Sequence, residues 1–172
     1  MSNYWAIAIG INQYKNFQPL LYAQWDAQAL WTYWVREGGI PHTQCMLLTD
    51  SATPDQGASA RTSAMQPTKK TIEQQLVEWG HHRVGPDDTL WCFFSGYGLS
   101  HQGKDYLMPL DGDPNNIEQT GIAADAFFTT LKAAPANRIV VLLDLKRWAK
   151  GDVSAADPLA ANTQAPEYRV GD

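Results

Sequence analysis

Several short stretches of the chain are almost continuously apolar, without the alternating polar residues that mark a strand with one face in water. A run of this kind is typical of a strand buried on both faces, as in a parallel sheet. Between these runs, apolar residues recur at helical spacing. This alternation predicts an α/β protein with a mostly parallel sheet and helices on both faces. The expected strands are residues 5–11, 45–48, 89–95 and 138–143, and the expected helices are residues 23–37, a helix capped by Thr68, and residues 124–133.

The last two predicted strands are followed by residues that can carry chemistry. Residues 95–98 read Ser-Gly-Tyr-Gly, and residues 144–147 read Asp-Leu-Lys-Arg. Neighbouring strands lie about 5 Å apart, and open α/β sheets place their sites at the carboxyl ends of the strands. We therefore expect Tyr97 and Lys146 to face each other across a cleft.

The segments outside this pattern divide the chain into a folded part and a tail. Residues 51–67 contain almost no large apolar residue and are predicted to form a long loop. Residues 98–110 are predicted to form a small hairpin with a tight turn. After Gly151 the apolar periodicity ends, which is typical of irregular chain. We expect one domain over residues 1–150 and a polar, irregular tail over residues 151–172.

Composition and charge narrow the choice of partners and cofactors. The 172 residues carry a net charge of -5, with Lys and Arg scattered, so neither nucleic acid nor a membrane is expected as a partner. The apolar runs are also too short to span a bilayer. Cys45 and Cys92 each lie inside an apolar run, which suits a reducing compartment, and we expect a cytoplasmic location. No nucleotide-binding loop or zinc-ligand spacing is present, so these residues predict no cofactor.

A series of segments, in order along the chain, carries a family resemblance. They are residues 6–14 (AIAIGINQY), 21–27 (LYAQWDA), 47–53 (LLTDSAT), 88–98 (DTLWCFFSGYG), 106–111 (YLMPLD) and 138–144 (RIVVLLD). Together they resemble the caspase-like cysteine peptidases, in particular the metacaspases and their prokaryotic relatives, the orthocaspases. The resemblance covers residues 4 to about 148. It implies a three-layer α/β/α sandwich in which the large-subunit strands are present and the small-subunit strands are missing.

The chain departs from the family at both catalytic positions. The resemblance places the family's histidine base at Tyr97 and its cysteine nucleophile at Lys146. Attack on an amide needs a thiolate and a base, and ordinary pKa values of about 10 for Tyr and about 10.4 for Lys suit neither role. We therefore predict no peptidase activity and a pseudo-peptidase that acts as a binding or regulatory module. The backbone N–H groups of Gly98 and Lys146 are the candidates for a remaining oxyanion hole.

Two alternatives to this prediction remain open. One is a cysteine-type endopeptidase with Arg or Lys preference, in which other residues would have to replace the missing nucleophile and base. Cys45 and Cys92 are expected to be buried, and His101 is the best-placed imidazole for the base. The other is a structural scaffold that dimerises through an exposed sheet edge, since strand 138–143 has no predicted neighbour on one side. We expect a protein or peptide partner: a small-subunit-like segment of a longer protein, a second copy, or an active relative.

The resemblance also implies two binding sites made of acidic residues. In the metacaspases, acidic side chains at the positions of Asp26 and Asp144 line a pocket for Arg or Lys, and we expect Lys146 to border this pocket or to fill it through an ion pair. Some metacaspases also bind calcium near the cleft. The candidates for calcium are Asp111, Asp113, Asp125 and Asp152, for which turn and cap roles are the simpler alternative.

Overall fold

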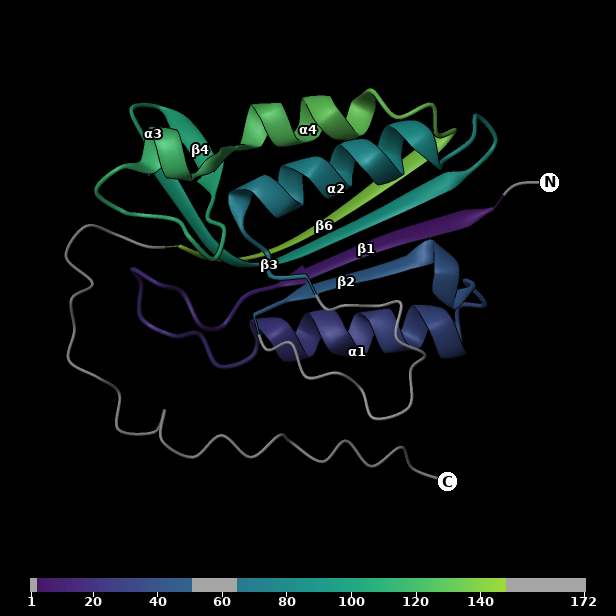
Figure 1. Ribbon diagram of the computed structural model, residues 1–172, viewed down its shortest axis with the longest axis horizontal. Helices are drawn as coiled ribbons and strands as arrows, with labels where there is room; N and C mark the ends of the chain where they lie inside the picture. Colours follow the sequence, from purple (N-terminus) through teal and green to yellow (C-terminus); the bar gives the residue numbers. More distant parts are fainter. Residues whose placement is uncertain (1–2, 51–64, 148–172) are drawn as a thin grey trace.

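The computed structural model describes residues 3–50 and 65–147 and forms three layers. Figure 1 shows a twisted sheet with helix α1 on one face and helices α2 and α4 on the other. The predicted three-layer α/β/α arrangement is thereby confirmed. Within the described residues, no helix has both the length and the apolar character that crossing a membrane requires.

The elements follow one another in the predicted alternation. The helices are α1 (Ala23–Arg36), the 3-10 turn η1 (His42–Gln44), α2 (Lys69–His82), α3 (Ile117–Thr120) and α4 (Ala124–Lys132). The strands are β1 (Tyr4–Gly10), β2 (Cys45–Thr49), β3 (Thr89–His101), β4 (Lys104–Leu107), β5 (Ile122–Ala123) and β6 (Arg138–Arg147). The short elements α3 and β5 were not predicted, because segments of two to four residues carry no periodicity to recognise.

The sheet is mixed but mostly parallel, as expected. Strand order along one path is β2-β1-β3-β4-β5, and β6 pairs with the opposite side of β3. β1 runs parallel to β2 and β3, and β6 runs parallel to β3. β4 pairs antiparallel with the end of β3 and with β5. The central strands β1 and β3 therefore have neighbours on both sides, and helices cover both of their faces (Figure 1), which explains their continuous apolar sequences.

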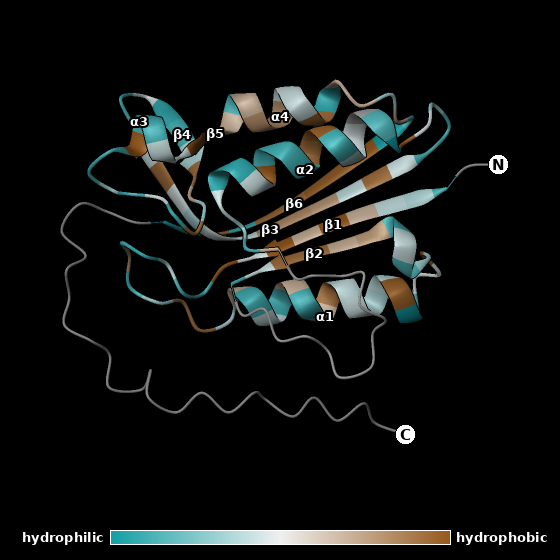
Figure 2. Cartoon of the chain, in the orientation of Figure 1, coloured by the Kyte–Doolittle hydropathy of each residue, from teal (hydrophilic) through white to brown (hydrophobic). Residues whose placement is uncertain are grey.

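The two faces of the sheet bury two separate hydrophobic clusters. One cluster lies toward α2 and α4 and includes Phe94 and Phe127. The other lies toward α1 and includes Trp34 and Phe93. Figure 2 shows the hydrophobic residues concentrated along the strands and the hydrophilic ones on the outer helix surfaces. From Leu90 to Phe94, successive residues of β3 thus point to opposite clusters, which fixes the register of this part of the strand.

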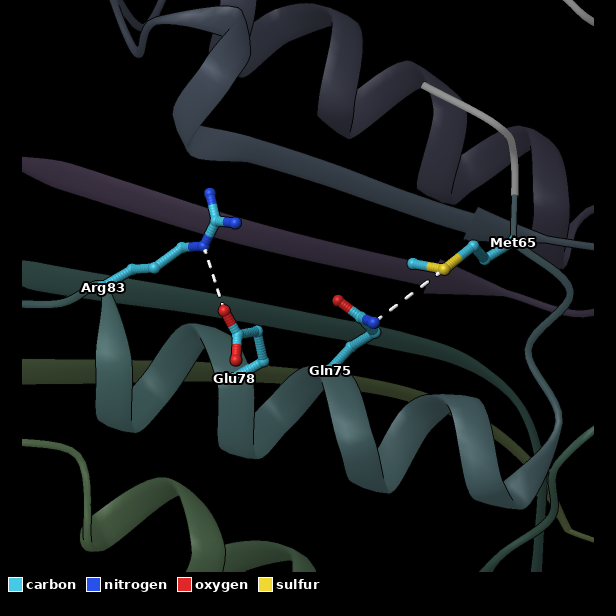
Figure 3. Close-up of polar contacts among 4 residues, drawn as sticks. All are labelled: Met65, Gln75, Glu78 and Arg83. Atoms are coloured by element: carbon cyan, nitrogen blue, oxygen red, sulfur yellow. Dashed lines mark hydrogen bonds and ion pairs between the residues drawn. The ribbon is translucent and has the colours of Figure 1, made fainter. Parts of the chain in front are cut away.

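Polar residues hold the starts of the elements in place. Thr68 caps α2 as predicted, because its side chain accepts a hydrogen bond of 3.2 Å from the Thr71 N–H. Met65, just before this helix, forms an isolated parallel β-bridge with Leu48 of β2. Its sulfur accepts a hydrogen bond of 3.8 Å from the Gln75 side-chain amide in α2 (Figure 3). The N-terminus of α2 is therefore attached to the edge of β2.

Strands β3 and β6 are both longer than predicted. They were expected to end at residues 95 and 143, but their parallel pairing continues to Gly98 and Arg147. The glycines near the end of β3 resemble a turn signal, yet a Cβ at Gly96 would lie 2.3 Å from the Tyr14 hydroxyl. Glycine stands there because another side chain approaches the strand, and not because the strand ends.

The predicted hairpin is present at the end of β3. β3 and β4 pair from Gly98 with Leu107 to His101 with Lys104. The turn residues Gln102 and Gly103 have φ angles of 50° and 76°, the left-handed conformation that short hairpin turns require. Of the predicted loop at 51–67, residues 51–64 lie outside the described residues, as does the predicted tail at 151–172.

Candidate functional site

Tyr97 and Lys146 are direct neighbours in the register of β3 and β6. The two positions are adjacent, as expected, but they lie within continuous sheet. The Tyr97 side chain is only 5% exposed, whereas Lys146 is exposed at the sheet edge. This corrects the expectation that the two side chains face each other across a cleft, because the strands do not end before these residues.

Aromatic rings enclose Tyr97. Its ring centroid lies 5.1 Å from that of Tyr14 and 5.0 Å from that of Phe17, which stacks on it. The Tyr97 N–H donates to the Tyr14 hydroxyl over 2.8 Å, and that hydroxyl donates to the Met108 carbonyl over 3.3 Å. Burial, as the largest cause, raises the pKa of Tyr14 well above its usual value. This cluster is therefore a packed, largely buried group of aromatic side chains.

A pocket of about 250 Å³ lies on the α1 side of the sheet, next to this cluster. It brings together Asp26 from α1, Ser95 from β3, and Asp144 and Lys146 from β6. The Ser95 hydroxyl donates a 3.2 Å hydrogen bond to the Asp144 carboxylate. The remaining wall comes from the segment that leads into α1 and from the sheet backbone: Leu20, Leu21, Tyr22, Ala23, Gly96 and Leu145. We call this the acidic pocket.

The negative charge of Asp144 acts on the carboxyl group of Asp26 in the acidic pocket. The pKa of Asp26 is raised, first by partial burial and second by the negative charge of Asp144. Two carboxylates in one pocket create a negative potential there, which the positive charge of Lys146 at the border partly offsets.

Lys146 borders the acidic pocket without closing it. Among the described residues, the ion pair shorter than 4.0 Å joins Arg83 Nε to Glu78 Oε1 at 3.7 Å, near the C-terminal end of α2 (Figure 3). Lys146 therefore makes no such contact with Asp26 or Asp144. This corrects the expectation that Lys146 fills the pocket through an ion pair: its side chain extends from an exposed edge, where water competes for the ammonium group.

The residues considered for a catalytic rescue are not placed for one. Burial raises the pKa of the Cys45 thiol to about 11 and that of Cys92 to about 12, so neither forms a thiolate near neutral pH. His101 and Ser100 line a different cavity of about 600 Å³ beside the β3–β4 hairpin, on the other side of the sheet. There the Ser100 hydroxyl contacts Asp105 across the hairpin.

The oxyanion candidates lie in the paired part of the sheet. Gly98 is flanked by Leu107 of β4 and by Arg147 of β6. Lys146 has β3 on one side only among the described residues. A role for these N–H groups in binding a carbonyl oxygen stays a prediction.

The calcium candidates are spread over separate local roles. Asp111 accepts a 2.8 Å hydrogen bond from the Lys69 N–H at the start of α2, and Asp113 accepts one of 2.8 Å from the Asn115 N–H within its own turn. Asp125 is exposed in the first turn of α4, and Asp152 lies outside the described residues. No three His, Cys, Asp or Glu side chains of the described residues converge to hold a metal ion.

A comparison with sequence models of protein families identifies the family of this chain. The sequence model of the caspase domain, a peptidase family, matches residues 3–167. The chain belongs to the caspase domain family. The resemblance drawn from the separate motifs is thereby confirmed, and the three layers around β1, β3 and β6 are those of a caspase domain. No curated protein sequence matches the chain.

The sequence alone did not reveal several residues that shape the site of this caspase domain. Phe17 and Tyr14 enclose Tyr97, and Ser95 binds Asp144. Tyr14 had a signal, because it ends the apolar strand in the motif GINQY. Phe17 had none, since an aromatic residue in a loop can lie inside or outside the fold depending on how the loop turns.

Proposed function

We propose that this caspase domain is a pseudo-peptidase that binds a protein or peptide partner through an Arg or Lys side chain held in the acidic pocket. The observation that supports this proposal is the convergence of Asp26 and Asp144 on one pocket, beside positions 97 and 146 that hold tyrosine and lysine. A partner's guanidinium or ammonium group would receive charge-assisted hydrogen bonds from the two carboxylates.

The chemistry of the neighbouring positions supports binding over cleavage. A nucleophile must be activated by a base or by a lowered pKa. Tyr97 is packed between Tyr14 and Phe17, and Lys146 is exposed at the sheet edge, so it lacks the desolvation that activates a nucleophilic lysine. Since both members of the nucleophile–base pair are replaced, the chemistry that depends on them is lost.

Peptide binding tests the pocket directly. A fluorescent peptide with one central arginine should bind, and the same peptide with citrulline, which keeps the shape without the charge, should bind at least 10-fold more weakly. Asp144→Asn should weaken arginine-peptide binding by about 10- to 100-fold, because a charge-assisted hydrogen bond contributes roughly 1.5–3 kcal/mol. The matched control is Asp125→Asn, which removes an exposed aspartate outside the pocket. Equal binding of the two peptides, or no effect of Asp144→Asn, would overturn the proposal.

Lys146 supplies a second test of the same pocket. Its positive charge lies at the border of the pocket and opposes a bound cation. Lys146→Ala should therefore increase affinity for the arginine peptide several-fold, and this gain should shrink at high salt because exposed charges are screened.

Cleavage assays separate the proposal from the endopeptidase alternative. The unmodified protein should release no fluorophore from Arg or Lys substrates and should not react with a thiol-directed activity probe. The double substitution Tyr97→His with Lys146→Cys restores both residues that the family uses. Cleavage by the unmodified protein would favour the endopeptidase, whereas cleavage only by the double variant would support a pseudo-peptidase with an intact pocket.

A further inference from the structure

One edge of the sheet is apolar and, within residues 3–50 and 65–147, unpaired. β6 pairs with β3 over residues 138–147, and no other strand of the described residues lies on its second side. Leu142, Leu143 and Leu145 are 40%, 39% and 37% exposed. An edge strand that presents free backbone groups and apolar side chains is a template for pairing with another strand. A single soluble chain usually protects such an edge, so this one calls for a cover.

We propose that the cover is a second copy of the chain, whose β6 pairs antiparallel with this one around Val141. A two-fold axis perpendicular to the sheet reverses the strand direction and keeps each face continuous. In such an antiparallel pair, each residue lies opposite a residue of the second copy whose side chain points to the same face of the sheet. Residues on one face of a strand are an even number of positions apart, so the midpoint between two opposed positions falls on a residue. The two-fold axis can therefore pass through one residue of β6, and the charges along the strand select which one.

The charges of β6 are arranged for an axis at Val141. Arg138 and Asp144 are equally distant from it in sequence, so each arginine opposes the aspartate of the second copy. Residues 139–143, all apolar, oppose one another between these two ion pairs. The strand is therefore self-complementary. Opposite charges meet at both ends of the paired segment, and β-branched and leucine side chains meet in its middle; both kinds of cross-strand pair are favourable.

Other positions of the axis match less well. An axis at Leu142 places Arg138 opposite Lys146 of the second copy. An axis at Asp144 places that carboxylate opposite the same carboxylate of the second copy. Both arrangements are destabilising, because like charges then lie directly opposite each other. An axis at Leu143 sets Lys146 against Val140. An axis at Leu145 pairs Asp144 with Lys146 but aligns only residues 143–147 of the described chain.

The sequence favours a second copy over residues 148–172 as the occupant. Those residues contain Pro158 and Pro166, which cannot donate to a strand ladder. Their β-branched residues are limited to Val153, Thr163 and Val170 and their aromatic residues to Trp148 and Tyr168, and Ala is the commonest of the rest. Such a composition is poor in the residues that form strands, whereas β6 is rich in them.

A charge-swap experiment tests the dimer and its register together. The full chain should sediment with twice the mass of one 19.1 kDa chain. Arg138→Asp and Asp144→Arg should each dissociate the dimer, because each variant opposes like charges twice. An equimolar mixture of the two variants should form a mixed dimer, since opposite charges then meet at both positions. A monomeric wild type, or single variants that stay dimeric, would overturn the proposal; in the first case residues 148–172 or another protein cover the edge.

A disulfide experiment checks the position of the axis. Directly opposed strand residues have Cα atoms roughly 4.5–5.5 Å apart, a separation that a disulfide bridges. Val141→Cys should therefore cross-link the two copies under mild oxidation. Val140→Cys is the control, because it lies about 7–8 Å from its own copy on the diagonal. Cys45 and Cys92 are buried and should not compete. Faster cross-linking of Val140→Cys than of Val141→Cys would overturn the register.

Discussion

The first half of β3 and the apolar part of β6 have nearly the same kind of sequence but very different surroundings. They are register partners, from Leu90 beside Ile139 to Phe94 beside Leu143. Leu90 and Phe94 are fully buried, whereas Leu142 and Leu143 are 40% and 39% exposed. The difference lies in the neighbours: β3 has β1 on its other side, and β6 has no second strand among the described residues.

This contrast shows what an apolar run in a sequence records. The run indicates that both faces of a strand are covered in the folded protein, because the side chains point to the faces and not to the edges. For β3, the fold of one chain provides that protection. For β6 the described residues do not provide it, and the exposed leucines mark the place where the proposed dimer would supply it. The proposed dimer and the acidic pocket beside Asp144 both lie at this incompletely covered strand.

Leucine truncations should show the largest difference between the two strands. Leu90→Ala should lower the free energy of unfolding by about 2–5 kcal/mol, because it leaves a cavity in a fully buried site. Leu142→Ala should cost about 1 kcal/mol or less in dilute protein, since its side chain is already 40% exposed. Urea unfolding measures both. Equal costs in dilute protein would show that β6 is covered within one chain.

The cost of Leu142→Ala should also depend on protein concentration. If a second copy covers β6, raising the concentration stabilises the wild type by mass action and enlarges the penalty of the variant. The penalty of Leu90→Ala should not change in this way, because that side chain is buried inside one chain. A concentration-independent penalty for both variants would argue against the dimer.

The start of both strands depends on Asp88, and its loss should have a smaller effect. The buried carboxylate accepts hydrogen bonds from the N–H groups of Asn3 and Gly85 and from the Trp5 indole. Its backbone carbonyl accepts from the N–H groups of Asn137 and Arg138, just before and at the start of β6. Asp88→Asn should cost about 1–3 kcal/mol, the range for leaving buried donors poorly paired. Urea unfolding at pH 7 measures this loss.

The stability that Asp88 contributes should also depend on pH. Burial acts to raise its pKa, but the hydrogen bonds outweigh burial and hold the pKa below the ordinary 3.8. The carboxylate form is therefore favoured in the folded state, so the contribution is complete above pH 3.8 and is lost as the pH falls through the lowered value. Asp88→Asn should lack this acid-sensitive component. A wild type and variant with the same decline in acid would contradict the assignment.

The smallest effect should be found at the acidic pocket. The pKa of Asp26 is raised by burial first and by the charge of Asp144 second. Asp144→Asn removes the second cause, so the pKa of Asp26 should fall and yet stay above 3.8. A carbon-detected NMR titration of the Asp26 carboxyl measures the change, with Asp125→Asn as the control that leaves it unaltered. An unshifted Asp26 in Asp144→Asn would mean that the two carboxylates do not interact.

The sequence predicted the layers of the fold but not the lengths of the strands. Runs of apolar residues and the helical spacing around Trp34 and Leu76 depend on neighbours close in the chain, so they placed β1, α1, β2 and α2 within a few residues. The end of β3 was missed because Gly96 and Gly98 resemble turn residues, and the end of β6 was missed because its apolar run stops at Asp144. The role of the two glycines is set by Tyr14 and Leu145, which reach them from other elements.

By itself, the sequence determined the family, the alternation of strands and helices, and the replacement of the two catalytic residues by Tyr97 and Lys146. Through the family resemblance it also indicated that Asp26 and Asp144 line one pocket. Only the tertiary structure decided that Tyr97 is enclosed by Tyr14 and Phe17, that Ser95 binds Asp144, and that β3 and β6 stay paired as far as Gly98 and Arg147. The reason is physical. Local patterns record which side chains must be buried, whereas the partner of each side chain depends on how distant segments pack, and a pattern along one strand carries no record of what lies beside it.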